Sequence, residues 1–172
     1  YGRPSASPVP YRPRILAFAY ARVQRLDCVN IMSHLFPSPE WATAYKEAIN
    51  TNPKYKVAGR EWTHGAVAMV VKADASLGID QDMAVWLDVD RGVCTDCRLM
   101  PASEAQGAPF IIVADYARWK TVIKKELDPI KGMMQNKLKL TKGHMPTMVK
   151  YVNSSRELVE TTSLVATKFR DE

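Results

Sequence analysis

Long apolar runs are missing from this sequence of 172 residues, although hydrophobic residues make up 47% of it. A transmembrane helix needs about 20 consecutive apolar residues, and no window from 32 to 172 approaches that length. The apolar run 15–20 has only six residues and is followed by Ala21-Arg22. The sequence therefore predicts no membrane span, and its length corresponds to about one globular domain.

Cysteine is also scarce, with Cys28, Cys94 and Cys97 as its only occurrences. An odd number without a recognisable secretory signal argues against a disulfide framework and favours a reducing compartment, which predicts a cytoplasmic location. Cys94 and Cys97 have C-x-x-C spacing but fall in a predicted strand, where positions three apart face opposite sides. No second C-x-x-C completes a zinc site. We therefore expect no redox pair, no metal and no cofactor.

The sequence has little net charge outside its first segment. Residues 1–31 carry five arginines against the single acid Asp27, a net charge of +4, whereas 19 basic and 17 acidic residues from Met32 onward leave only +2. A nucleic-acid-binding domain usually carries a concentrated basic surface. The balance after residue 32 therefore argues against a nucleic-acid partner.

The segment 1–31 differs from the rest in being rich in proline and arginine. It could be an organelle transit segment, a surface arm, or an artefact of the recorded start with Met32 as the natural first residue. The last two interpretations fit better than the first. We predict a dispensable leader over 1–31 and a single domain over 32–172.

Catalytic motifs are lacking as well, since the sequence contains no G-x-S-x-G, P-loop or G-x-G-x-x-G pattern. His34, His64 and His144 are scattered without metal-ligand spacing. The acidic residues between 88 and 96 surround a predicted turn, where a solvated role is the simpler interpretation. The sequence favours a protein that is not an enzyme. A small enzyme, or an accessory domain of one, that uses a pocket in the same fold is the alternative.

Helices are predicted wherever a capping residue precedes an apolar repeat. Ser38 and Pro39 begin a helix that ends near Pro53, and Asp115 and Asp128 begin two shorter ones. A longer helical segment follows from Met145, with a bend expected at 153–155 because those side chains compete with the helical backbone.

Strands are predicted by alternating or fully apolar runs bounded by turn residues. The runs 62–72, 83–89, 93–100 and 109–114 form consecutive strands, with a hairpin at 90–92, and 137–141 forms a later one. Short connections favour an antiparallel meander with helices covering one face. We therefore predict an α+β fold with about five mostly antiparallel strands.

Methionine gathers in the C-terminal half of the chain. Met133, Met145 and Met148 flank the strand of Leu138 and Leu140. One interpretation is that these side chains form an ordinary hydrophobic core. However, methionine is flexible and suits a wall that must fit varied apolar shapes, and a small sheet covered by helices can hold a cavity between the layers.

Three segments of the sequence resemble the C-terminal half of the sterol carrier protein type 2 (sterol-binding domain) family. They are 119–123 with its tryptophan helix, 127–134 with its short helix, and Lys137-Leu138-Lys139-Leu140-Thr141-Lys142-Gly143 with its strand and turn. The resemblance covers about 40–168. It departs at His144-Met145-Pro146, which makes the start of the last helical segment stiffer than expected.

The resemblance implies an apolar tunnel between sheet and helices that binds a sterol, a fatty acid or a fatty acyl-CoA. It implies non-catalytic lipid binding or transfer, with a lipid as partner and brief contact with a membrane surface. Carried onto this sequence, it assigns the lining of the tunnel to Trp119, Ile123, Met133, Leu138, Leu140, Met145, Met148 and Val152.

Overall fold

The computed structural model describes residues 32–172, of which Ser33–Glu172 form one contact-rich unit. The prediction of a dispensable leader falls on 1–31 and lies outside the described residues. Within 32–172, no helix combines the length and the apolar character that crossing a membrane requires.

Helix α2 (Pro39–Thr51) begins where the sequence predicts it, because the Ser38 side chain accepts a hydrogen bond of 3.0 Å from the Trp41 backbone amide. Its apolar stripe faces the sheet and is buried. Asn52 ends α2 and caps a short helix that was not predicted, α3 (Pro53–Ala58), by accepting from the Lys54 amide. Proline at the first position of each helix fixes the backbone angle and removes an amide that would lack a partner.

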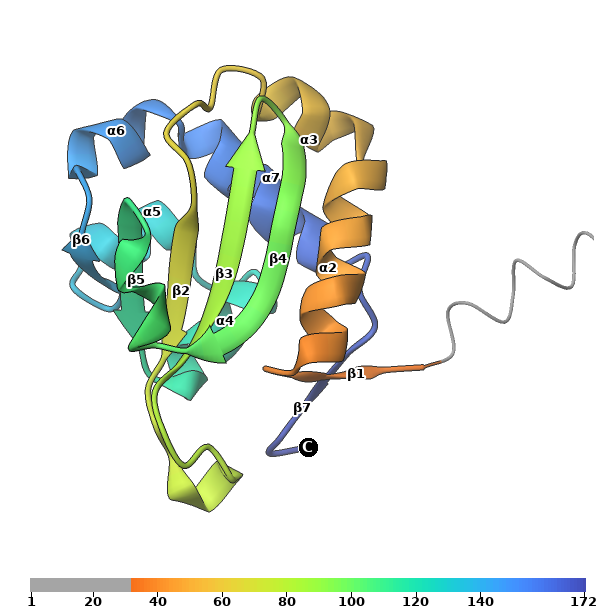
Figure 1. The fold of residues 1–172 in the computed structure, drawn as a ribbon, viewed down its shortest axis with the longest axis vertical. Helices are drawn as coiled ribbons and strands as arrows, with labels where there is room; N and C mark the ends of the chain where they lie inside the picture. The colour runs from red at the N-terminus through yellow and green to blue at the C-terminus, as the bar shows by residue number, and fades with distance from the viewer. Residues whose placement is uncertain (1–31) are drawn as a thin grey trace, which may run out of the picture. The chain divides into compact units, whose positions relative to one another are not determined.

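Five strands form the main sheet in the order β4-β3-β2-β5-β6 (Figure 1). Neighbouring strands run antiparallel except β2 and β5, which are parallel. The predicted α+β class with a mostly antiparallel sheet is therefore confirmed. The strands are β2 (Val67–Val71), β3 (Met83–Asp90), β4 (Val93–Pro101), β5 (Phe110–Ala114) and β6 (Lys139–Lys142).

The predicted meander is wrong in its connection after β4. The chain passes through a short 3₁₀ helix, η2 (Glu104–Gly107), and inserts β5 beside β2 at the other side of the β2–β3 pair. β5 is buried at four of its five positions. An interior place between β2 and β6 buries both of its faces, whereas an edge place beside β4 would expose backbone and side chains.

The β3–β4 hairpin carries two irregularities that matter for the core. Arg91 and Gly92 both adopt positive φ (46° and 81°), which gives the tight turn that matches strand twist. The pairing also shifts between Asp88 and Val89, so that a bulge precedes Cys97. The prediction that Cys94 and Cys97 face opposite sides is wrong. The bulge adds one residue between them, so that both side chains lie on the buried side under α2.

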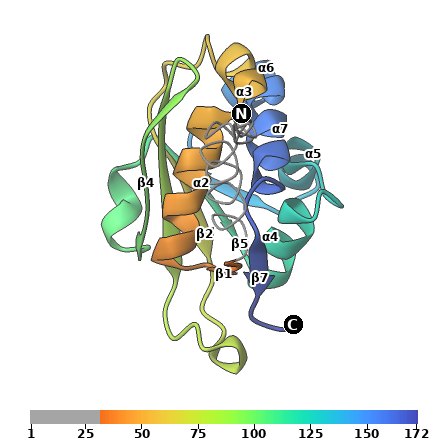
Figure 2. The same cartoon turned by 90° about the vertical axis from the view of Figure 1, so that its right-hand side faces the viewer.

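The C-terminal half supplies helices that lie, with α2, over one face of the sheet (Figure 2). Asp115 and Asp128 cap α4 and α5 as predicted. The predicted bend also occurs, but at Tyr151 rather than 153–155. The helices are α4 (Tyr116–Ile123), α5 (Pro129–Met134), α6 (Met145–Lys150) and α7 (Val152–Thr162).

A second, two-stranded parallel sheet was not predicted. It joins β1 (His34–Phe36) to β7 (Thr167–Phe169), and the Trp41 indole donates to the Thr167 hydroxyl at 2.9 Å. Each strand has three residues, too few to show an alternating pattern in the sequence. This pairing ties the end of the chain to the start of α2.

Candidate functional site

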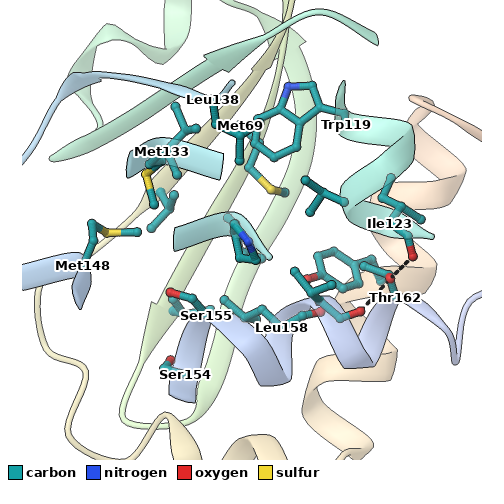
Figure 3. A pocket seen from close by; sticks show the side chains of 18 of the residues that line it. Met69, Trp119, Ile123, Met133, Leu138, Met148, Ser154, Ser155, Leu158 and Thr162 are labelled. Carbon is teal, nitrogen blue, oxygen red and sulfur yellow. Dashed lines mark hydrogen bonds between the residues drawn. The ribbon is translucent and has the colours of Figure 1, made fainter. Parts of the chain in front are cut away.

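An apolar cavity of about 80 Å³ lies between the main sheet and the helices (Figure 3). Its floor is the helix-facing side of the sheet, where alternate residues of a strand point the same way. The floor residues are Val67, Met69, Leu87, Val89 and Ile112.

Five helices, strand β1, the loop before β2 and the residue before β6 close this cavity. The β1 strand and α2 contribute Phe36, Trp41 and Tyr45, and Trp62 reaches in from the loop. The C-terminal half of the chain contributes the remaining lining: Trp119, Val122, Ile123, Pro129, Met133, Leu138, Met148, Ser154, Ser155, Leu158, Val159 and Thr162.

Five of the eight residues assigned by the resemblance line this cavity. They are Trp119, Ile123, Met133, Leu138 and Met148, and Figure 3 shows them converging from α4, α5, α6 and the residue before β6. Their spacing in the sequence already indicated apolar faces. The structure adds that these faces meet around one space.

The other three assigned residues, Leu140, Met145 and Val152, do not line the cavity. Each is partly buried and packs against the same core. Leu140 lies on the edge strand β6, and Met145 and Val152 are the first residues of α6 and α7. Contact with a ligand stays a prediction for all eight residues.

Sequence reasoning did not assign to the lining the residues that α7 and α2 contribute. Ser154 and Ser155 are polar and gave no apolar signal, and Trp41 and Tyr45 belong to a helix far away in the sequence. The sequence indicated the amphipathic stripe of α2. A stripe alone does not indicate which other helix packs next to it. The Tyr45 hydroxyl donates to the Leu158 carbonyl at 2.8 Å and so joins α2 to α7.

The polar atoms of the lining are mostly engaged within the protein. The Trp62 indole donates to the Gly65 carbonyl at 2.9 Å, and the Trp119 indole donates to the Val70 carbonyl at 2.8 Å. Burial raises the pKa of Tyr45 well above its ordinary value, so its hydroxyl stays neutral. Among the described residues of this lining, none is an acid, a base or a histidine.

The two cysteines in the described range do not line this cavity, and they are buried under α2 without a disulfide. Burial raises the pKa of the Cys94 thiol to about 12 and that of Cys97 further. A protonated thiol is a poor nucleophile and a poor metal ligand. Over residues 32–172, no three His, Cys, Asp or Glu side chains are grouped so that they could hold a metal ion.

Solved structures provide the decisive comparison. A crystal structure of sterol carrier protein 2 matches with 31% sequence identity and a TM-score of 0.70, over 75% of this chain and 98% of that chain. The chain belongs to the sterol carrier protein 2 family. No family model matches the sequence, and a search of curated proteins gives no match.

A second sterol-carrier-like structure supports the same assignment. A conserved hypothetical protein from Thermus thermophilus, described as a possible sterol carrier protein, matches with 29% identity and a TM-score of 0.72. The match covers 81% of this chain and 96% of that one. The sterol carrier protein 2 fold therefore spans the described part of the chain, and the predicted resemblance is confirmed.

Proposed function

We propose that this chain binds a lipid between its sheet and its helices and transfers it between membranes without changing it chemically. The observation that carries the proposal is the cavity itself, which lies between the layers of a sterol carrier protein 2 fold and is walled by aromatic, aliphatic and methionine side chains. Removing lipid hydrocarbon from water contributes about 25 cal/mol per Å². No chemical step is needed for that function.

The cavity must expand to hold a lipid. Its volume of about 80 Å³ is well below the roughly 300–1,000 Å³ of ordinary ligand pockets. The elements best suited to move are α5 and α6, which have six residues each, and the flexible side chains of Met133 and Met148, which fill the space between them and the sheet. A tunnel long enough for a lipid therefore forms when these elements shift outward.

The outer surface of the same elements suits an anionic membrane. Residues 129–150 contain five lysines and no acid, and all five lysines are exposed. None of them forms an ion pair within 32–172, whereas the lysines of α4 and of the segment that follows it pair with acids near the C-terminus. Met134 and Val149 are 69% and 45% exposed. We call residues 129–150 the basic face. This face binds a bilayer that contains anionic lipids.

Catalysis in this cavity would need convergent acid–base groups, which the described lining lacks. We also propose a cytoplasmic location, which the free, buried Cys94 and Cys97 support.

The test is lipid pick-up from fluorescent donor vesicles by the full chain and by two tryptophan variants. Met148→Trp fills the cavity and should abolish uptake, whereas Met145→Trp makes the same change at a residue outside the lining and should retain most of it. Folding of both variants is checked by thermal unfolding. Failure of the parent chain to take up any lipid, or equal uptake by both variants, would contradict the proposal.

A further inference from the structure

The chemical character of the cavity wall restricts the lipids that it can accept. No lysine, arginine, histidine, aspartate or glutamate is among the described residues that line it. A carboxylate or phosphate moved into such surroundings loses its hydration and gains no opposite charge. The wall therefore discriminates against any lipid whose charged head must lie inside.

Most of the polar side chains that line the cavity already form hydrogen bonds within the protein. The Thr162 hydroxyl donates within its own helix, to the Val159 carbonyl at 2.7 Å, and the indoles of Trp62 and Trp119 each donate to a backbone carbonyl. Ser154 and Ser155 also line the cavity, and no hydrogen bond joins either hydroxyl to another group within residues 32–172. Ser154 is buried and Ser155 is half-buried. A hydroxyl can donate one hydrogen bond and accept two.

The place of Ser155 gives the cavity a polar end. Figure 3 shows it on α7 near Met148, at the opposite end of the drawn lining from Ile123 and Thr162. Between these ends lie the floor of the sheet and the side chains of Met69 and Leu158. A ligand with one polar group and a long apolar body fits this arrangement in one direction.

We propose, building on the function proposed above, that the cargo is an uncharged lipid whose single hydroxyl or carbonyl group hydrogen-bonds to Ser155 while its hydrocarbon lies along the sheet. A long-chain alcohol, a sterol or a neutral ester meets this description. A fatty acid meets it only in its protonated form, because the wall offers nothing to stabilise the carboxylate.

This selectivity predicts that pH changes the affinity for a fatty acid but not for an alcohol of equal chain length. If only the protonated acid binds, the dissociation constant of dodecanoic acid rises about tenfold for each pH unit above the pKa of a free carboxyl group, about 4–5 in water. It should rise about 100-fold between roughly pH 5.5 and 7.5. Dodecanol has no titrating group, so its dissociation constant should change less than about twofold over the same range and reports any effect of pH on the protein.

Tryptophan fluorescence measures both ligands without a label. Trp41, Trp62 and Trp119 line the cavity, whereas Trp86 packs on the other face of the sheet. Binding of either ligand should therefore shift the emission, and Trp86 contributes a constant background.

A serine variant tests the polar end. Ser155→Ala should weaken dodecanol binding about fivefold, the equivalent of one neutral hydrogen bond, and leave dodecane binding unchanged. Ser163→Ala is the matched control, because Ser163 lies exposed beyond the end of α7 and its hydroxyl donates to the Glu160 backbone carbonyl. It should change neither ligand.

The outcomes separate this inference from the function on which it rests. If dodecanoic acid binds as tightly as dodecanol at pH 7.5 and shows no pH dependence, the head lies outside the cavity and the inference is overturned. Equal loss of dodecanol and dodecane in Ser155→Ala overturns the role of Ser155. If neither ligand, nor a sterol, binds at any pH, it is the lipid-binding function itself that fails.

Discussion

Met148 and Met145 lie one turn apart in α6 but have different surroundings. Met148 is 3% exposed and borders the cavity, whereas Met145 is partly buried against the core. Truncating a methionine in a filled core costs about 2–5 kcal/mol. A side chain that already borders empty space makes fewer contacts, so its loss costs less.

We expect Met148→Ala to unfold within a few degrees of the parent when lipid-free, yet to bind a fluorescent lipid markedly more weakly, because Met148 borders the cavity. Met145→Ala is the comparison, because Met145 packs against the core outside the lining, and it should change lipid binding much less. Differential scanning fluorimetry and a binding titration measure the two effects, and a Met148→Ala variant that unfolds would identify Met148 as ordinary core.

The thiols of Cys94 and Cys97 should be inert in the folded protein. Burial raises the pKa of Cys94 to about 12 and that of Cys97 further, so at pH 8 almost no thiolate exists. In a Cys28→Ala background, a thiol reagent should therefore label both residues quickly in denaturant and very slowly without it. Fast labelling of the native protein, or stoichiometric zinc in the protein as purified, would contradict the prediction.

At the scale of elements, the β3–β4 hairpin meets α3 at a backbone contact that only glycine permits. A Cβ on Gly92 would lie 2.6 Å from the Lys56 carbonyl oxygen, and the residue has φ of 81°. The backbone of the turn therefore packs directly against the backbone of α3.

Gly92→Ala should lower the free energy of unfolding by about 2–4 kcal/mol, from the left-handed backbone and the clash together. Gly107→Ala is the matched control, because a Cβ there meets no atom within 4 Å, and it should change stability by less than about 0.5 kcal/mol. Urea denaturation of the two variants compares them. Equal stability would show that the turn can relax.

At the scale of the whole molecule, the basic face predicts how the protein meets a membrane. Lys137→Gln with Lys139→Gln should weaken binding to vesicles with anionic lipid about tenfold or more, since each lysine near such a surface contributes about 1 kcal/mol. The control removes the same charge from α3, as Lys54→Gln with Lys56→Gln, and should have little effect. Vesicle sedimentation at low and high salt measures both. Equal loss in the two pairs would show that only net charge matters.

The prediction that residues 1–31 are dispensable also concerns the whole molecule. Ser33–Glu172 contain a complete buried core of their own, so a chain of 32–172 should unfold at nearly the same temperature as the full chain. A large loss of stability on truncation would contradict this.

The sequence by itself determined the local elements and the family. Caps at Ser38, Asp115 and Asp128 depend on residues at most three positions away, and such short-range signals are readable before folding. The glycine turn at 91–92 and the Lys137–Gly143 stretch are local for the same reason. They were enough to predict the α+β class and the sterol carrier resemblance.

Only the tertiary structure decided which elements meet. The place of β5 beside β2, the bulge that brings Cys94 and Cys97 to one side, and the β1–β7 pair depend on partners far along the chain. The cavity also depends on contacts between distant residues, because α2 and α7, which close it, are joined by residues more than 100 positions apart. Ser155 looks like a surface serine in sequence, and only packing turns it toward an apolar space.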